Sequence, residues 1–312
     1  MILTLSIVLI IASLLLVVLV LLHRGKGGGD KNQGREKQGQ PLPQRGAAFV
    51  ANAASFALPI SNPANLVIYD GALPGLAHWA RVFGLASLAA VLATFAALRF
   101  AFRRELDGQA EASEAPPLTL EGRIAAVAVI ASAFALLAAS ALRLPLGPPA
   151  CAVALAGVAA VGIAQRKWQG PLLREVSWTS LLLVAGLFVI VRALESTGAL
   201  ATLANLASRG EGRGFAALAA CLAALACNLM NNLPAGMLAA SALGAAHAGE
   251  GVRNAVAIGI DLGPNLTVIG SLSTVLWLLA VRREGLDVGG WHFLRVGLVA
   301  TPLAMAAALA LL

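Results

Sequence analysis

Residues 227–243 read CNLMNNLPAGMLAASAL, and residues 253–278 read RNAVAIGIDLGPNLTVIGSLSTVLWL. Both stretches are apolar enough for a bilayer, but asparagines and a proline interrupt the first, and Asp261, Gly263 and Pro264 interrupt the second. Because proline cannot continue a regular helix, each stretch predicts two half-helices that meet at a break. Backbone groups freed at such a break are tolerated in a membrane where they are buried in protein or line a cavity.

The composition of the whole chain agrees with a membrane-embedded fold. Of the 312 residues, 59% are hydrophobic and 12% are charged, and the mean hydropathy is +0.84. These values exclude an ordinary soluble domain, and the alternation of apolar and polar residues that a spanning β-strand needs does not appear. We therefore predict an all-α polytopic membrane protein. Spanning segments are expected at residues 1–22, 84–102, 124–142, 147–164, 178–194, 215–230, 233–248, 252–280 and 294–312.

The basic residues lie between the apolar runs. The net charge is +7, but Lys and Arg do not gather on one amphipathic face, so nucleic acid is not an expected partner. The positive-inside rule places the basic loops in the cytoplasm and predicts a multi-pass protein of the inner (plasma) membrane, surrounded by the lipid bilayer. These loops hold residues 23–45, Arg99, Arg103 and Arg104, Arg166, Lys167 and Arg174, and Arg282 and Arg283.

Two parts of the chain resemble each other. HWARVFGLASLAA, from His78, is similar to WHFLRVGLVATPLA, from Trp291. A break precedes each of them: SNPANLVIYDG, from Ser61, and DLGPNLTVIGS, from Asp261. Interrupted segments at corresponding places in two halves mark the substrate site of inverted-repeat transporters. Chance similarity between alanine-rich helices is the alternative explanation.

The chain divides into five predicted segments. LVVLVLLHRGKGGG, at residues 16–29, makes residues 1–29 similar to the first helix of the SecG subunit of the protein-export translocon, although nothing after Asp30 continues that resemblance. The segments are a transmembrane helix of uncertain origin (1–22), a basic glycine-rich linker (23–46), the remnant of a first repeat (47–104), an acidic cytoplasmic linker between repeats (105–121) and a second repeat (122–312).

Polar residues at the breaks are the candidates for a substrate or ion pathway. Amides beside a proline break can form a neutral polar cage for a hydroxyl-bearing solute or a cation, or can merely cap half-helices. Asp261 is a candidate proton or ion relay, because a carboxylate in an apolar segment is costly unless it is paired, protonated or facing water; a helix cap is the alternative. The candidates are Asn228, Asn231, Asn232, Asp261, Gly263, Pro264, Asn265, Thr267, Ser271, Ser61, Asn62 and Asn65.

No residues with the arrangement of an enzyme site stand out. The sequence offers no nucleophile with a partnered base, no metal-ligand cluster and no phosphate-binding loop, so we predict a secondary transporter without catalytic residues, bound metal or cofactor. Cys221 and Cys227 are six residues apart, which on a regular helix puts them on different faces. We expect these cysteines to serve packing, and a site of several thiolates for trivalent arsenic is the alternative.

The two opening stretches, together with WHFLRVGLVATPLA and VSWTSLLLVAGLFVIVRALESTGAL from Val176, resemble the arsenical-pump membrane permeases of the ion-transporter superfamily. The resemblance covers residues 49–312. It implies inverted repeats, re-entrant hairpins and unwound helices. It also implies export of arsenite or antimonite as the neutral hydroxide in exchange for protons, alone or driven by a cytoplasmic arsenical-pump ATPase. The second-repeat residues above would form the site, with Ser61, Asn62 and Asn65 opposite.

One departure from that family and several alternatives remain open. Family members carry several spans before the first break, whereas this chain has residues 1–22 there. We therefore expect an incomplete first repeat. One interpretation of the chain is an inactive fragment. A sodium/proton antiporter or a carboxylate carrier would use similar broken helices, but a carboxylate needs cationic or hydroxyl partners and the breaks contain no Lys or Arg. A translocon-associated membrane protein without transport activity is the other alternative.

Overall fold

The computed structural model describes residues 42–69, 73–103, 119–142, 144–166, 198–208, 210, 212–283 and 288–312, with scattered positions between 182 and 193. Over these residues the regular elements are helices and no strand occurs, which confirms the all-α prediction. The polytopic prediction is also confirmed, because five helices are long and apolar enough to cross a membrane. They are α4 (Leu76–Ala101), α6 (Leu120–Ala141), α7 (Gly147–Gln165), α11 (Gly212–Met230) and α15 (Gly290–Ala310).

The other described helices are shorter. They are α2 (Leu42–Ala53), α3 (Pro63–Ile68), α10 (Ala199–Ser208), α12 (Asn232–Ala245), α13 (Glu250–Leu262), the 3₁₀ turn η1 (Gly263–Asn265) and α14 (Leu272–Arg283). The apolar stretch 252–280 is therefore not a single span: it consists of two helices and the break that Gly263 and Pro264 predict.

Some predicted segments differ from the structure or fall outside it. Helix α2 begins at Leu42, inside the stretch 23–46 that was expected to be a linker. The expected helix at residues 1–22, most of the linker 105–121 and most of the span 178–194 lie outside the described residues.

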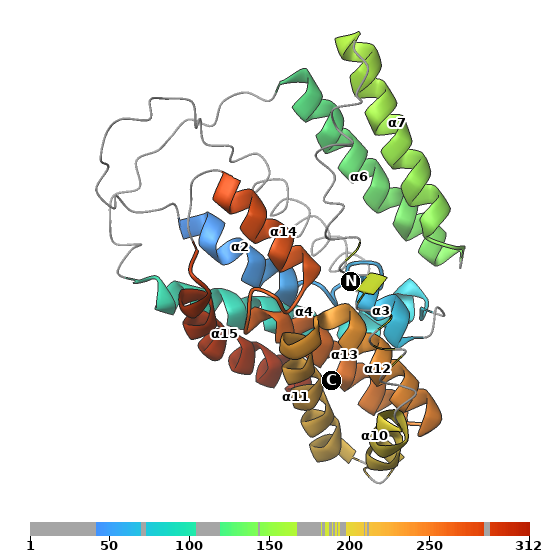
Figure 1. The fold of residues 1–312 in the computed structure, drawn as a ribbon, viewed down its shortest axis with the longest axis vertical. Helices are drawn as coiled ribbons and strands as arrows, with labels where there is room; N and C mark the ends of the chain where they lie inside the picture. Colours follow the sequence, from blue (N-terminus) through green and yellow to red (C-terminus); the bar gives the residue numbers. More distant parts are fainter. Residues whose placement is uncertain are drawn as a thin grey trace.

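Helices α4 and α15, which carry the two similar sequences, pack against each other (Figure 1). The Phe102 ring, at the end of α4, lies 5.9 Å from the His292 ring, at the start of α15, so the helices run antiparallel. Both bury alanines, including Ala86 and Ala304, and such small side chains let helix backbones approach closely. An inverted repeat predicts this antiparallel arrangement of equivalent helices, although the division into repeats stays a prediction.

Both ends of this bundle carry arginines, and one end carries more of them. Arg99 and Arg103 lie at the end of α4, where α15 begins, and Arg282 and Arg283 end α14 beside it. At the opposite end lie Arg81, Arg213 and Arg253, and the starts of α11 and α13 and the end of α15 line a common cavity of about 440 Å³ there. The positive-inside rule predicts that the first end faces the cytoplasm and the second end faces the outer side of the membrane.

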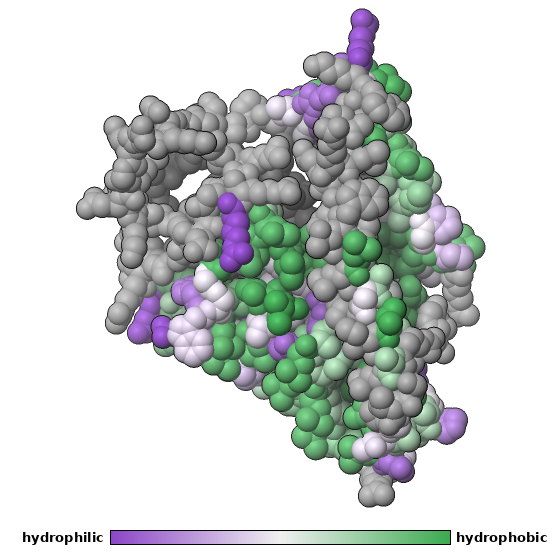
Figure 2. Space-filling model, in the orientation of Figure 1, coloured by the Kyte–Doolittle hydropathy of each residue, from purple (hydrophilic) through white to green (hydrophobic). Residues whose placement is uncertain are grey.

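Helices α6 and α7 form a hairpin that lies beside the rest of the molecule (Figure 1). Gly157 on α7 leaves room for Ala128 on α6, because an added Cβ would lie 3.0 Å from the alanine Cβ. Almost none of the residues in either helix is buried by other parts of the protein. Apolar side chains cover much of the described surface on the face shown in Figure 2. Such a surface is suited to contact with lipid.

Candidate functional site

The break between α13 and α14 lies against helix α11. At Gly263 an added Cβ would lie 2.6 Å from the Ala224 Cα and 2.6 Å from the Ala224 carbonyl oxygen, so glycine is required for this close approach. Pro264 follows, and the α-helix gives way here to the 3₁₀ turn η1. The chain then turns through residues 266–271 before α14 begins at Leu272. The polar groups of this break therefore lie inside the protein.

Asp261 is buried at the end of α13, with a relative exposure of 1%. Its Oδ1 accepts a hydrogen bond from the Asn62 amide, while its Oδ2 has no hydrogen-bond partner. Ser55 and Asn65 also lie near the carboxylate. The amide and hydroxyl side chains near Asp261 are thus neutral and come from residues 55–65. A carboxylate buried in this way in a membrane protein is a candidate functional group.

The sequence SNP explains how Asn62 reaches this place. Asn62 is the N-cap of α3, where its Oδ1 accepts from the Ala64 N–H at 3.0 Å. Pro63 occupies the first helical position, where its missing N–H and fixed φ are suited to a helix start. Because the side-chain oxygen caps the helix, the Asn62 amide nitrogen is left to donate to Asp261.

A second network joins the end of α2 to the break. Asn52 Nδ2 donates to Asn265 Oδ1 at 3.0 Å and to Thr274 Oγ1 at 3.1 Å. Asn265 Nδ2 in turn donates to the Phe49 carbonyl oxygen at 3.1 Å, and its side chain is fully buried. The Ser271 hydroxyl lies 2.9 Å from Thr274 Oγ1. These bonds fix the start of α14 and η1 against α2.

The tip between α11 and α12 forms the opposite wall of the same break. Asn228 Nδ2 donates to the Gly263 carbonyl oxygen at 3.0 Å, and its Oδ1 accepts from Thr267 Oγ1 at 2.7 Å. Asn231 Nδ2 donates to the Ile269 carbonyl oxygen at 3.0 Å. The backbone N–H of Asn232 donates to the Gly270 carbonyl oxygen at 2.8 Å.

Asn231 has a strained backbone. Its φ of 75° and ψ of 154° lie in a region that residues other than glycine rarely adopt, at a cost on the order of 1–3 kcal/mol. Its side chain compensates, because Oδ1 accepts from the Leu233 N–H at 3.4 Å and caps α12. Strain of this kind persists where surrounding contacts hold it and is concentrated at functional sites.

The structure brings most of the predicted residues into one region. Asn62 and Asn65 lie at Asp261, while Asn228, Asn231 and Asn232 bond to the turn after η1, which contains Thr267. Gly263, Pro264, Asn265 and Ser271 are buried within the break itself. Ser61 is the exception, because it is exposed. Whether these residues carry substrate stays a prediction.

Asn52 and Ser55 were not among the candidate residues predicted from the sequence. Both lie in the apolar stretch 47–60, where a lone amide is a signal of a buried polar contact. Cys221 is exposed and Cys227 is buried, so the two lie on different faces of α11, as their spacing predicts. Cys227 Sγ lies 3.5 Å from the Ile260 carbonyl oxygen, in the packing between α11 and α13. Among the described residues, no group of three or more His, Cys, Asp or Glu could hold a metal ion.

Comparison with known proteins identifies the family. Residues 34–282 match the protein-family model CitMHS, described as "Citrate transporter", and this match covers more than half of the chain. The chain belongs to the citrate transporter (CitMHS) family. As a member of this transporter family with five membrane-length helices, it is a multi-pass protein of the inner membrane. The matched residues begin after the run that resembles SecG, and that run lies outside the described residues.

Curated relatives of this CitMHS protein include arsenical pumps. The "Arsenical pump membrane protein" of Yersinia enterocolitica is 28% identical over 275 residues, which are 82% of this chain and 62% of that protein. The protein of the same name in Escherichia coli (strain K12) is 28% identical over 281 residues, with the same two shares. These relatives confirm the expected resemblance. An uncharacterized transporter of Mycobacterium tuberculosis (strain ATCC 25618 / H37Rv) is 33% identical over 166 residues, or 50% of this chain and 39% of that protein.

The chain therefore spans less than two thirds of the length of the arsenical pumps that it matches.

Proposed function

We propose that this chain is a secondary transporter that exports arsenite or antimonite as the neutral hydroxide in exchange for protons. The observation that carries this proposal is the environment of Asp261. Its carboxylate is buried among neutral groups, with Oδ1 bonded to an amide and Oδ2 without a partner. A carboxylate in this position is suited to take up and release a proton during a transport cycle.

The groups around the breaks suit a neutral cargo that carries hydroxyls. Amide and hydroxyl side chains both donate and accept hydrogen bonds, as Asn228 and Thr267 do here, so they can exchange their mutual bonds for bonds to the hydroxyls of the cargo. Neither described break contains Lys or Arg. An anion would lack a cationic partner and would lie near the Asp261 carboxylate. The names of the relatives support the same cargo.

A citrate-like carboxylate is the second candidate cargo. The family description supports it, and one structural feature favours it. Ser271, Ser273 and Thr274 gather their hydroxyls at the N-terminus of α14, where Ser271 Oγ lies 2.8 Å from Ser273 Oγ. Hydroxyls at a helix N-terminus can bind a carboxylate without a basic side chain.

Arsenite accumulation in efflux-deficient cells tests the first candidate. Cells that express the chain are expected to hold less arsenite than cells with an empty vector. Asp261→Asn should abolish this difference at equal membrane abundance, because it removes the proton-carrying group. Glu121→Gln, which removes an exposed carboxylate at the start of α6, is the matched control and should export normally. No decrease in arsenite with the wild-type chain present in the membrane would refute the cargo, and transport of labelled citrate by the same membranes would establish the second candidate.

The energy source is a separate part of the proposal. In inside-out vesicles, an imposed proton gradient should drive arsenite uptake without ATP if the chain works as a proton exchanger. The proposed cytoplasmic arsenical-pump ATPase should add an ATP-dependent rate when it is supplied. Uptake that needs ATP and ignores the gradient would refute proton exchange.

A further inference from the structure

A row of polar side chains runs along one face of α13 and meets Asn62 and Tyr69, the two cap residues of α3. Glu250, Asn254 and Asp261 lie at positions i, i+4 and i+11 of α13, which a helix of 3.6 residues per turn brings to one face. At the inner end of this face Asn62 donates to Asp261, and nearer its start Tyr69 donates to Asn254 at 2.5 Å. The two segments therefore run antiparallel with their polar faces in contact.

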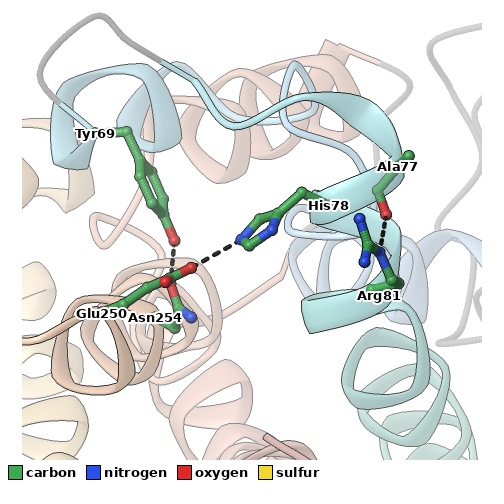
Figure 3. Close-up of polar contacts among 6 residues, drawn as sticks. All are labelled: Tyr69, Ala77, His78, Arg81, Glu250 and Asn254. Carbon is green, nitrogen blue, oxygen red and sulfur yellow. Dashed lines mark hydrogen bonds and ion pairs between the residues drawn. The ribbon is translucent and has the colours of Figure 1, made fainter.

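The outer end of this row is open to solvent. His78 Nε2 lies 2.8 Å from Glu250 Oε1, and the two side chains are 46% and 60% exposed. Figure 3 shows this pair, from α4 and α13, beside the bond between Tyr69 and Asn254. The described charged and titratable groups at this end are Glu250 and Arg253 on α13, His78 and Arg81 on α4, Arg213 at the start of α11, His247 before α13, and Tyr69 after α3.

Two of the arginines at this end bond to backbone oxygens. Arg253 Nη1 donates to the Ile68 carbonyl oxygen at 3.4 Å, which is a further link between α13 and α3. Arg81 Nε donates to the Ala77 carbonyl oxygen of its own helix at 3.3 Å, as Figure 3 shows. Neither of these bonds is made to the carboxylate of Glu250.

Tyr69 is held as a neutral hydrogen-bond donor. Burial raises the pKa of its phenol, and the charge of Glu250 raises this pKa further. Its ring packs edge-to-face on Trp79, with centroids 5.4 Å apart, which fixes the direction of the hydroxyl. Tyr69 and Asn254 are both buried, so their hydrogen bond lies between the exposed His78–Glu250 pair and the inner part of the polar face.

An apolar layer separates this bond from Asp261. Asn254 and Asp261 are seven residues apart, which is about 10 Å along the helix axis. Ile258 lies on the same face between them, and Ala64 and Ile68 of α3 are fully buried in the same cluster. A proton cannot cross this distance without water, so the layer insulates Asp261 while the two helices stay together.

We propose that the hydrogen bond of Tyr69 to Asn254 and the pair of His78 with Glu250 form an outer gate through which protons reach Asp261. The proposal rests on the proton-carrying role of Asp261 stated above. When the gate parts, water enters between α3 and α13 and a proton passes from the exposed pair to the carboxylate. This end of the bundle carries fewer of the described arginines than the opposite end, so the positive-inside rule places the gate on the outer side of the membrane.

The accessibility of Asp261 tests the gate directly. Right-side-out and inside-out vesicles that contain the full chain are treated with a water-soluble, membrane-impermeant carbodiimide, and modification of Asp261 is followed by mass spectrometry. Tyr69→Phe keeps the ring on Trp79 and removes the hydroxyl. We expect it to raise the rate of Asp261 modification roughly fivefold to tenfold in right-side-out vesicles, the change that the loss of one bond holding a closed state produces. The rate in inside-out vesicles should stay unchanged.

Two further variants keep the test decisive. His78→Ala changes an exposed position, so it should fold normally and raise the outer rate by about twofold, as expected for loss of an exposed ion pair. Ser87→Ala removes a buried hydroxyl that bonds within α4, and it should leave the rate unchanged. An equal increase from both faces, or no increase in Tyr69→Phe and His78→Ala, would overturn the gate. Because the reaction needs no arsenite, the expected labelling together with absent arsenite export would support the gate and refute only the cargo.

Discussion

Gly297 offers a sharp test of the packing that holds the break in place. An added Cβ at this position of α15 would lie 2.0 Å from the Asn265 carbonyl oxygen and 3.0 Å from the Leu266 Cα. Both atoms belong to the backbone of η1 and its cap, which cannot rotate away as a side chain can. Gly297→Ala must therefore push α15 and the break apart by roughly 1 Å, and overpacking of this kind destabilises by about 1–3 kcal/mol. The displaced break should also impair transport.

Gly84→Ala is the matched control for this prediction. Gly84 is also a buried helical glycine, in α4, but an added Cβ would meet nothing within 4 Å. Alanine should therefore be tolerated there and should stabilise the helix by about 0.5–1 kcal/mol. The assay is the thermal unfolding midpoint of the detergent-solubilised protein, measured by fluorescence-detected size exclusion. Gly297→Ala should lower the midpoint by several degrees and Gly84→Ala should not. Equal midpoints for the two variants would refute the close approach of α15 to the break.

Three other substitutions test individual contacts at the breaks. Asn52→Ala leaves the buried Asn265 Oδ1 without its donor, so it should destabilise the protein by about 1–3 kcal/mol in thermal unfolding and reduce export; wild-type stability would contradict the network. Asn228→Ala and Thr267→Val remove the same bond, so the double variant should lose little more export than the worse single variant, whereas fully additive losses would show independent roles. Cys227→Ala should still export arsenite at normal membrane abundance, because its thiol packs against α13; complete loss of export from a stable variant would instead indicate arsenic binding by sulfur.

The existence and type of the main elements followed from the sequence. Apolar length predicted the spanning helices, and the residues DLGPN predicted the place where α13 gives way to η1 and α14. SNP predicted a break in the apolar run, and Asn62 and Pro63 occupy the cap and the first turn of α3. These features are local, because proline, glycine and asparagine act on the backbone within a few residues of their position.

The partners of the polar groups could not be derived in the same way. Asn52 bonds to Asn265 and Tyr69 bonds to Asn254, across separations of 213 and 185 residues. No periodicity in the sequence specifies such pairs, because they depend on how α2 and α3 pack against α13 and η1. The sequence also placed Ser61 in the candidate site on the strength of the repeat alone, whereas the structure leaves it exposed.

The two breaks correspond in sequence but differ at one decisive position. Asn65 and Asn265 stand at equivalent places in SNPANL and DLGPNL, and both are fully buried. Ser61 begins the first break where Asp261 begins the second. Since the partner of Asp261 is Asn62, this carboxylate bridges the two breaks. A proton on Asp261 lowers the cost of keeping it buried, and its loss favours an arrangement in which water reaches the carboxylate. The protonated and deprotonated forms of Asp261 therefore favour different conformations, and this difference in free energy lets proton binding shift the equilibrium between two transporter conformations.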